Sequence, residues 1–388
     1  MVERYPDFRG KALLFLFFLW FIWFSNFSVR IVFSPILPIL EDEFMVSHAR
    51  ASAIFIFLST GYGMAVVFSG LFSGRYGYKK TIVFSLVCLS AVTFLIPFIG
   101  TFSFLYFFAL LLGFSVGLYI PSAIPLITEY YAERNWGKVI AFHDTGASGA
   151  IFATPFIALL LLHLLPWRGI FFVYGCIFLA CSIVFLFVSS EVRIAGSPWS
   201  IFRDIIRIPS LWLMAAIWVF GAGANLGIYA IVPLYLTKEL HMDIGHANTL
   251  LGISRLVSIG VAIACGFLVD RFNLRKIMFV MVATTGISTI LLGLVPVRHV
   301  GLVLFMQALF VTGFFPVGLL AIARTFKREM RGLATGVILC VSMIIGGGIV
   351  PYLLGISGDL YSFRLGIAIL GVLVTLVSVL VFRLKELE

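Results

Sequence analysis

The sequence predicts an all-α integral membrane protein with twelve transmembrane helices in two pseudo-symmetric six-helix bundles. Apolar runs of about 20 residues or more recur along the whole chain, enough to cross a hydrocarbon layer of ~30 Å as helices. Hydrophobic residues make up 62% of the 388 residues and charged residues 11%, whereas soluble domains carry roughly 25% charged residues. The second half of the chain also repeats landmarks of the first, and such an internal repeat sets the architecture.

The repeat is clearest in a short stretch that ends a long apolar run in each half. The first copy is Gly70-Leu-Phe-Ser-Gly74-Arg75-Tyr-Gly77-Tyr-Lys79-Lys80, and the second is Gly266-Phe-Leu-Val-Asp270-Arg271-Phe-Asn273-Leu-Arg275-Lys276. The copies lie 196 positions apart, and Glu43 with Glu239 and Pro155 with Pro351 keep this offset. We therefore predict one bundle at 1–190, a cytoplasmic linker at 191–209 and a second bundle at 210–388.

The apolar runs predict the helices in chain order. We expect them at about 12–36, 50–73, 80–100, 103–130, 137–162, 168–190, 210–236, 246–270, 275–295, 300–323, 332–356 and 362–383. Lysine and arginine are enriched in cytoplasmic loops. Twenty of these residues fall in the loops that share a side with both termini, and five fall in the other loops: Arg50, Arg168, Lys238, Arg298 and Arg364. We expect a multi-pass protein of a bacterial or archaeal cytoplasmic (inner) membrane, with both termini cytoplasmic.

Composition argues against several other classes of protein. The net charge of +10 is concentrated in loops on one side, so no nucleic-acid partner is expected. A phosphate-cradling glycine loop with its lysine, which an ATP-driven pump would need, is not visible. The five cysteines lie within apolar runs and lack metal-ligand spacing. We expect no enzymatic activity, no metal and no cofactor, and a monomer whose partners are the lipid bilayer, a small solute and optionally protons.

The repeated glycine, acidic and basic pattern resembles the loops between helices 2 and 3 and between helices 8 and 9 of the major facilitator superfamily. The resemblance covers the full chain and implies a secondary transporter with the major facilitator fold. In that family the loop takes part in a cytoplasmic charge relay that favours the outward-facing state. The implied gating residues are Gly70, Arg75, Gly77, Lys79, Gly266, Asp270, Arg271, Arg275 and Lys276. Gly74 stands at the acidic position of the first copy, which predicts a weakened charge relay in that half. Asn273 stands at the second glycine of the other copy.

Two arginines, Arg30 and Arg255, fall inside apolar segments. A guanidinium in hydrocarbon costs at least ~2.5 kcal/mol, so such a residue faces a cavity or a partner. Either each arginine is structural, paired with a helix end or extended to the membrane surface, or both point into a central cleft and bind an anion. Arginine suits an anion because its planar fork pairs with two oxygens of a carboxylate. An arginine in the eighth helix resembles the organic-anion (oxalate/formate and monocarboxylate) branches of the superfamily.

Asp144 in the fifth helix is an intramembrane acid, and its neighbour His143 is also titratable. The functional hypothesis is a proton-coupling site, because histidine titrates near neutral pH and burial disfavours a charged carboxylate. The structural alternative is that Asp144 pairs with basic residues of the cytoplasmic loops.

Polar side chains on the expected cleft helices are further candidates for substrate binding. Asn225 and Tyr229 stand at i and i+4 on one face of the seventh helix, and Tyr119, Gln307 and Asn26 lie on three other helices. Their amide and phenol groups could orient a small ligand or could join helix pairs, because small and polar residues support close packing in membranes. The glycines of the fifth and eleventh helices favour bending and close packing.

We therefore expect a secondary active transporter that moves a small anion, with a carboxylate favoured, by alternating access and with proton symport as an option. One alternative is a proton-coupled multidrug exporter, although the fifth helix lacks the glycine–proline signature of drug antiporters. A second is a transporter of an inorganic anion such as nitrate or cyanate. A receptor or scaffold that transports nothing would not need interior arginines.

Overall fold

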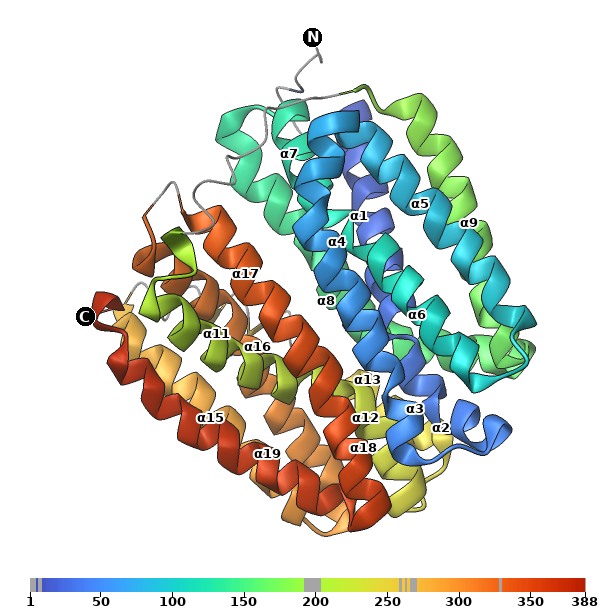
Figure 1. Ribbon diagram of the computed structural model, residues 1–388, viewed down its shortest axis with the longest axis vertical. Coiled ribbons are helices and arrows are strands. Elements are labelled where there is room, and N and C mark those ends of the chain that lie inside the picture. The colour runs from blue at the N-terminus through green and yellow to red at the C-terminus, as the bar shows by residue number, and fades with distance from the viewer. Residues whose placement is uncertain are drawn as a thin grey trace. The chain divides into compact units, whose positions relative to one another are not determined.

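The computed structural model describes residue 5 and residues 9–191, 204–257, 260–261, 264–265, 271–327 and 330–387. Within these ranges the chain is almost entirely helical (Figure 1). Eleven helical segments of the described residues are long and apolar enough to cross a membrane. The predicted span at 246–270 begins with α13 (Ile244–Ser254), and much of its later part lies outside the described residues, as does most of the predicted linker. The expected all-helical membrane fold is thus confirmed.

The chain forms two compact units. Unit 1 contains Met1–Phe33 and Thr60–Ser197, and unit 2 contains Ser34–Ser59 and Pro198–Glu388. The units therefore differ from the predicted halves of the sequence in one respect, because residues 34–59 pack with the second half. The reason is a series of contacts from this segment to unit 2, among them the bond from Ser34 Oγ to the Tyr229 carbonyl, at 2.6 Å.

Unit 1 is a bundle of long helices with two close pairs. Its helices are α1 (Lys11–Ile31), the later part of α4 (Ile54–Tyr76), α5 (Tyr78–Leu95), α6 (Phe102–Gly117), α7 (Ile120–Tyr130), α8 (Trp136–Leu164) and α9 (Trp167–Val188). The closest pairs are α1 with α8 and α5 with α9. Gly146 of α8 allows the first pairing, because a Cβ there would lie 3.0 Å from the Trp20 carbonyl oxygen.

Unit 2 repeats this pairing. It contains α2 (Phe33–Phe44), α3 (His48–Ser52), α11 (Pro209–Ala222), α12 (Ile228–Leu234), α13, α15 (Leu274–Leu294), α16 (Val300–Thr325), α17 (Arg331–Ile344), α18 (Val350–Leu360) and α19 (Phe363–Ser378). Here α11 packs on α17 and α15 packs on α19. These are the first and fifth, and the third and sixth, long segments of the second half, as α1–α8 and α5–α9 are of the first. The repeated pairing matches the repeat in the sequence.

The first predicted helix is longer than expected and is interrupted. It was predicted at 12–36, but α1 ends at Ile31 and α2 continues to Phe44. The helical hydrogen bonding changes where the chain passes from one compact unit to the other.

Unit 2 also contains widened helical turns that periodicity does not predict. π-helical turns occur at η3 (Gly223–Gly227), between α11 and α12, at η4 (Tyr235–Glu239) and at η6 (Ile345–Ile349), between α17 and α18. The glycine-rich turns η3 and η6 lie against each other, because a Cβ on Gly346 would stand 2.7 Å from Gly223 N. Single π turns are rare and occur frequently at functional sites.

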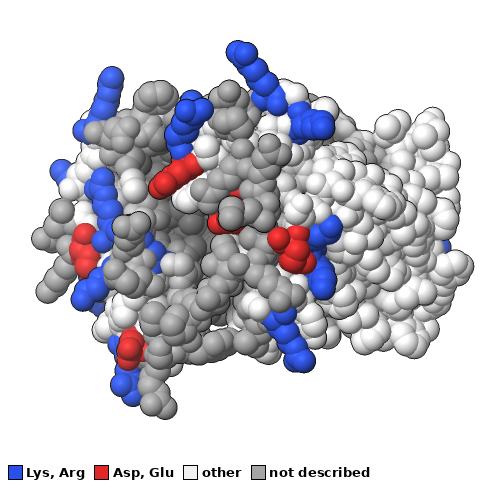
Figure 2. All heavy atoms as spheres, turned by 90° about the horizontal axis from the view of Figure 1, so that it is seen from above, with Lys and Arg blue, Asp and Glu red and all other residues white. Residues whose placement is uncertain are grey.

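Figure 2 shows lysine and arginine side chains spread over much of the face that it views. Fewer acidic side chains are visible among them on that face.

Candidate functional site

Arg255 lies at the end of α13 in unit 2, with 1% of its surface exposed. The sequence places it near the middle of the predicted eighth helix, but the regular helix ends at Ser254 and Arg255 lies in a turn. Its Nη1 donates a hydrogen bond to Asn225 Oδ1 at 2.7 Å. Its Cζ lies 5.4 Å from the centre of the Tyr229 ring. The structure thus brings together three residues that the sequence singles out, all within one compact unit.

The other two guanidinium nitrogens of Arg255 make no hydrogen bond that the structure describes. Nε and Nη2 are buried and have no hydrogen-bond partner among the described residues. These two nitrogens form one edge of the planar guanidinium, and such an edge can donate two parallel bonds to a carboxylate or a similar oxyanion. Leaving a buried charged donor unpaired is costly, so the geometry favours an anion at this edge.

The position of Asn225 depends on the π turn η3. This turn leaves the Ala224 carbonyl to accept a hydrogen bond from Gln307 Nε2, at 2.6 Å. Gln307 comes from α16 and is fully buried, and its Oε1 has no partner within the described part of the chain. Gln307 is therefore placed to hold the backbone that presents Asn225 to Arg255, rather than to reach Arg255 itself.

Arg30 lies in unit 1 and has different surroundings. Its side chain is 5% exposed, and its Cζ lies 4.3 Å from the ring centre of Tyr62 and 5.7 Å from that of Phe27. A guanidinium over an aromatic face is stabilised by the ring quadrupole. Tyr62 was not a candidate from the sequence, because it is one of many tyrosines in apolar runs and only the packing of α4 brings it to Arg30.

A buried polar cluster in unit 1 joins three helices. The rings of Trp23, Tyr119 and His143 lie nearly parallel, with pairwise centre distances of 5.9–6.0 Å. The Tyr119 hydroxyl donates to the Leu19 carbonyl at 3.0 Å and lies 3.2 Å from His143 Nε2. Because its single hydrogen serves Leu19, a hydrogen bond between the two side chains requires His143 Nε2 to be the donor, and in a neutral imidazole Nδ1 is then an acceptor.

Other polar atoms near this cluster lack partners. His143 Nδ1, both amide atoms of Asn26 and Ser122 Oγ are buried without a hydrogen bond to any described residue. Asn26 is one helical turn from Trp23, and Ser122 is one turn from Tyr119. Buried polar groups without partners are uncommon and call for an explanation, such as water or a ligand. Trp23 was missed from the sequence, since a tryptophan in an apolar helix gives no functional signal by itself.

His143 and Asp144 do not form a buried pair. His143 is fully buried, whereas Asp144 is exposed. Neighbouring helical residues point in directions about 100° apart, so their side chains occupy different faces of α8. The Asp144 carboxylate lies beside the Trp23 indole.

The two loop motifs begin their helices in different ways. Asn273 caps α15, because its Oδ1 accepts from the backbone N–H groups of Arg275 at 3.0 Å and Lys276 at 3.2 Å. The equivalent Gly77 has φ +88°, and a Cβ there would stand 2.0 Å from Glu191 Oε1. Glu191 accepts from the Lys79 N–H at 3.2 Å instead. Asn273, which departs from the family motif, thus caps its own helix. Gly77 instead leaves room for the carboxylate of Glu191, which is distant in the sequence.

The basic residues of the motifs contact aromatic rings and helix ends. Arg75 Cζ lies 5.6 Å from the Tyr76 ring centre, Arg275 Cζ lies 5.5 Å from that of Phe382, and Lys79 Nζ donates to the Leu186 carbonyl at 2.7 Å. Arg271 is exposed. Gly266 and Asp270 lie outside the described residues, and for Gly70 only the backbone in α4 is described.

Comparison with known proteins gives several relatives. A TsgA homolog of Erwinia tasmaniensis is 26% identical over 230 residues, 58% of this chain and 58% of that protein. An uncharacterised transporter of Bacillus subtilis, YcxA, is 20% identical over 328 residues, 79% of each chain. Human monocarboxylate transporter 6 is 32% identical over 150 residues, 37% of this chain and 28% of that protein. The chain thus spans a little over half the length of the first of these relatives.

Solved structures share the fold. A bacterial homolog of the human lysosomal transporter Spinster has a TM-score of 0.83 and 13% identity, and covers 98% of both chains. A D-xylose–proton symporter has a TM-score of 0.81 and 14% identity, and covers 97% of this chain and 99% of that one. The model of the Major Facilitator Superfamily matches residues 19–304 and 227–388. Because this match extends over more than half of the chain, the protein belongs to the major facilitator superfamily.

Proposed function

We propose that the protein is a secondary transporter of a small anion, with a carboxylate as the favoured class. The observation that carries this proposal is the buried Arg255, whose Nε and Nη2 edge has no partner among the described residues. Asn225 fixes the opposite side of the guanidinium through Nη1, so the group is already oriented before a ligand arrives. A monocarboxylate transporter among the relatives supports the same class of substrate.

The other candidate residues take supporting roles in this proposal. Tyr229 lies under the guanidinium, and Gln307 holds the π turn that carries Asn225. In unit 1, Asn26 and Tyr119 belong to a polar cluster with unpartnered atoms, and they remain predicted substrate-binding residues. Arg30 is a second cation in that unit, held over Tyr62. The gating role of the two loop motifs, the cytoplasmic orientation of both termini and the monomeric state are part of the same proposal.

A thermal-shift screen of the purified protein tests the proposed substrate class. A ligand that binds only the folded protein stabilises it by about 2.7 kcal/mol at a hundred times its dissociation constant. We expect mono- or dicarboxylates to raise the melting temperature, and cationic drugs at the same ionic strength to leave it unchanged. Stabilisation by nitrate or cyanate alone would favour the inorganic-anion alternative. Stabilisation by cationic drugs alone would contradict an anion transporter.

Asp144 is proposed as a proton-coupling residue, with His143 as its neighbour. Asp144→Asn should abolish pH-driven accumulation of substrate in proteoliposomes while leaving exchange of internal for external substrate largely intact. The reason is that asparagine keeps the size of the side chain but cannot bind and release a proton in this pH range. Comparison of accumulation and exchange in the same vesicles provides the control for folding. Accumulation that persists with its normal pH dependence would assign the proton site elsewhere.

A further inference from the structure

We infer that His48 and Glu41 form a proton-binding site that, with Asp42, Lys238 and Asp359, latches residues 34–59 to the second half of the sequence. We call these five residues the outer latch, because the loop charges place them on the side opposite the termini. They belong to α2, α3, η4 and α18, all within unit 2. This inference does not depend on the identity of the transported anion.

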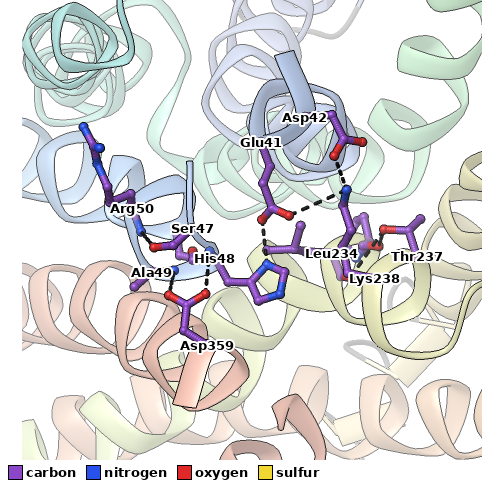
Figure 3. A network of polar contacts seen from close by, with 12 residues as sticks. Glu41, Asp42, Ser47, His48, Ala49, Arg50, Leu234, Thr237, Lys238 and Asp359 are labelled. Atoms are coloured by element: carbon purple, nitrogen blue, oxygen red, sulfur yellow. Dashed lines mark hydrogen bonds and ion pairs between the residues drawn. The ribbon is translucent and has the colours of Figure 1, made fainter. Parts of the chain in front are cut away.

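The contacts of the latch converge on Glu41 (Figure 3). Its Oε2 lies 2.7 Å from His48 Nδ1, and its Oε1 lies 3.6 Å from Lys238 Nζ. The same lysine contacts Asp42 Oδ1. Glu41 is buried, with 7% of its surface exposed, so its charge depends on these two partners. A lysine of the second half of the sequence is thus held by two consecutive acids of the first.

Asp359 fixes the other side of the latch. Its two carboxylate oxygens accept from the backbone N–H groups of His48 and Ala49, each at 2.9 Å. The helices α3 and α18 also approach closely here, because a Cβ on Gly355 would lie 2.7 Å from the His48 carbonyl oxygen. The Phe363 ring of α19 lies 4.9 Å from the His48 ring. His48 is therefore packed among α2, α18 and α19, with 24% of its side chain exposed.

The charge of the latch depends on His48. The charged groups around its ring are Glu41 of α2, Asp359 of α18 and Lys238 of η4, and beyond Phe363 lies the pair of Glu239 and Arg364. With a neutral His48, the three latch acids face one lysine. A proton on His48 adds a second cation beside Glu41 and strengthens its hydrogen bond. Histidine changes charge between pH 5 and 8, so acidification should close the latch and alkaline pH should loosen it.

The latch is connected to the surroundings of Arg255. Ser34 Oγ donates to the Tyr229 carbonyl at 2.6 Å, and Asn248 Nδ2 of α13 donates to the Pro35 carbonyl at 3.0 Å. Tyr229 contacts Arg255, and Asn248 stands two helical turns before it. Release of residues 34–59 would therefore change the contacts of both elements that carry the candidate anion site. Proton binding at the latch can thereby be coupled to the site without any contact between proton and anion.

Ser52→Cys reports the state of the latch. Ser52 is fully buried beneath it in α3, so a cysteine there should react with a bulky maleimide only when residues 34–59 separate from α18. We expect the labelling rate in detergent, without substrate, to rise about tenfold or more from pH 5.5 to pH 8, as loss of a charged hydrogen bond allows. Each labelling rate is divided by the rate of a Met45→Cys variant, because Met45 is 91% exposed. This ratio removes the pH dependence of the thiol. The parent protein corrects for its five native cysteines.

Two changes of His48 should have opposite effects on the Ser52→Cys reporter. His48→Gln, which cannot be protonated, should label rapidly at every pH, whereas His48→Lys, with a fixed charge, should label slowly at every pH. A folding defect would accelerate labelling in both variants. His246→Gln is the matched control, because His246 is an exposed histidine of unit 2 outside the latch, and it should keep the pH dependence. The same pH dependence in His48→Gln as in the parent, or rapid labelling of His48→Lys, would overturn the inference.

Discussion

Arg255→Ala should lose nearly all affinity for the transported anion, and Arg255→Lys should retain a fraction of it. A charged hydrogen bond contributes roughly 1.5–3 kcal/mol, which corresponds to about a ten- to hundredfold change in affinity. Lysine keeps the positive charge but cannot present two parallel donors as Nε and Nη2 do, so it should weaken binding by about this factor. Alanine removes both the charge and the donors. Binding of the anion found by the thermal-shift screen, measured by calorimetry, checks both variants.

Asn225→Asp separates loss of the binding site from loss of the fold. The substitution keeps the size of the side chain but places a carboxylate where the amide oxygen now lies, 2.7 Å from Arg255 Nη1. The guanidinium then has an internal counter-charge, so the melting temperature should rise while affinity for the anion falls. A general folding defect would lower both the melting temperature and the affinity.

Arg30→Ala should weaken binding less than Arg255→Ala, because the Arg30 guanidinium is already stacked on Tyr62. Unchanged anion binding by a folded Arg255→Ala protein would contradict the carboxylate proposal.

The fold could be predicted because its main cause is visible along the sequence. Long apolar runs must form helices in a bilayer, where every backbone polar group needs an internal partner, and the loop motif at Gly70 and Gly266 marks the repeat. The packing of residues 34–59 with the second half could not be predicted in this way. It depends on contacts such as Ser34 with the Tyr229 carbonyl, which join residues 195 positions apart and leave no periodic signal.

The candidate site could be predicted in part for a similar reason. An arginine within an apolar run is conspicuous because its desolvation is costly, and the i and i+4 spacing of Asn225 and Tyr229 indicated one helix face. The structure places both beside Arg255. The π turn that carries Asn225 was not predicted, because the elements that contact it, Gln307 of α16 and η6, lie far away in the sequence. A glycine-rich helical sequence is equally compatible with a bend, a close contact between helices or a widened turn.

The contact between the two π turns gives the largest expected effect on stability. Gly346 of η6 lies so close to η3 and α11 that a Cβ would stand 2.4 Å from the Val219 carbonyl oxygen and 2.7 Å from Gly223 N. Both are backbone atoms and cannot move aside as a flexible side chain would. Gly346→Ala must therefore push the two π turns apart, and overpacking of this kind typically costs about 1–3 kcal/mol. We expect a clearly lower melting temperature and, because η3 carries Asn225, weaker anion binding.

Gly336→Ala is the matched control for this prediction. Gly336 lies in α17, the helix that precedes η6, and a Cβ there would meet no atom within 4 Å. Alanine is a better helix former than glycine by up to about 1 kcal/mol, so Gly336→Ala should leave the melting temperature unchanged or raise it, with normal anion binding. The same substitution thus tests two glycines ten positions apart in one continuous helical segment. If Gly346→Ala and Gly336→Ala have the same melting temperature, the π turns are not in backbone contact. The support for Asn225 must then come from Gln307 alone.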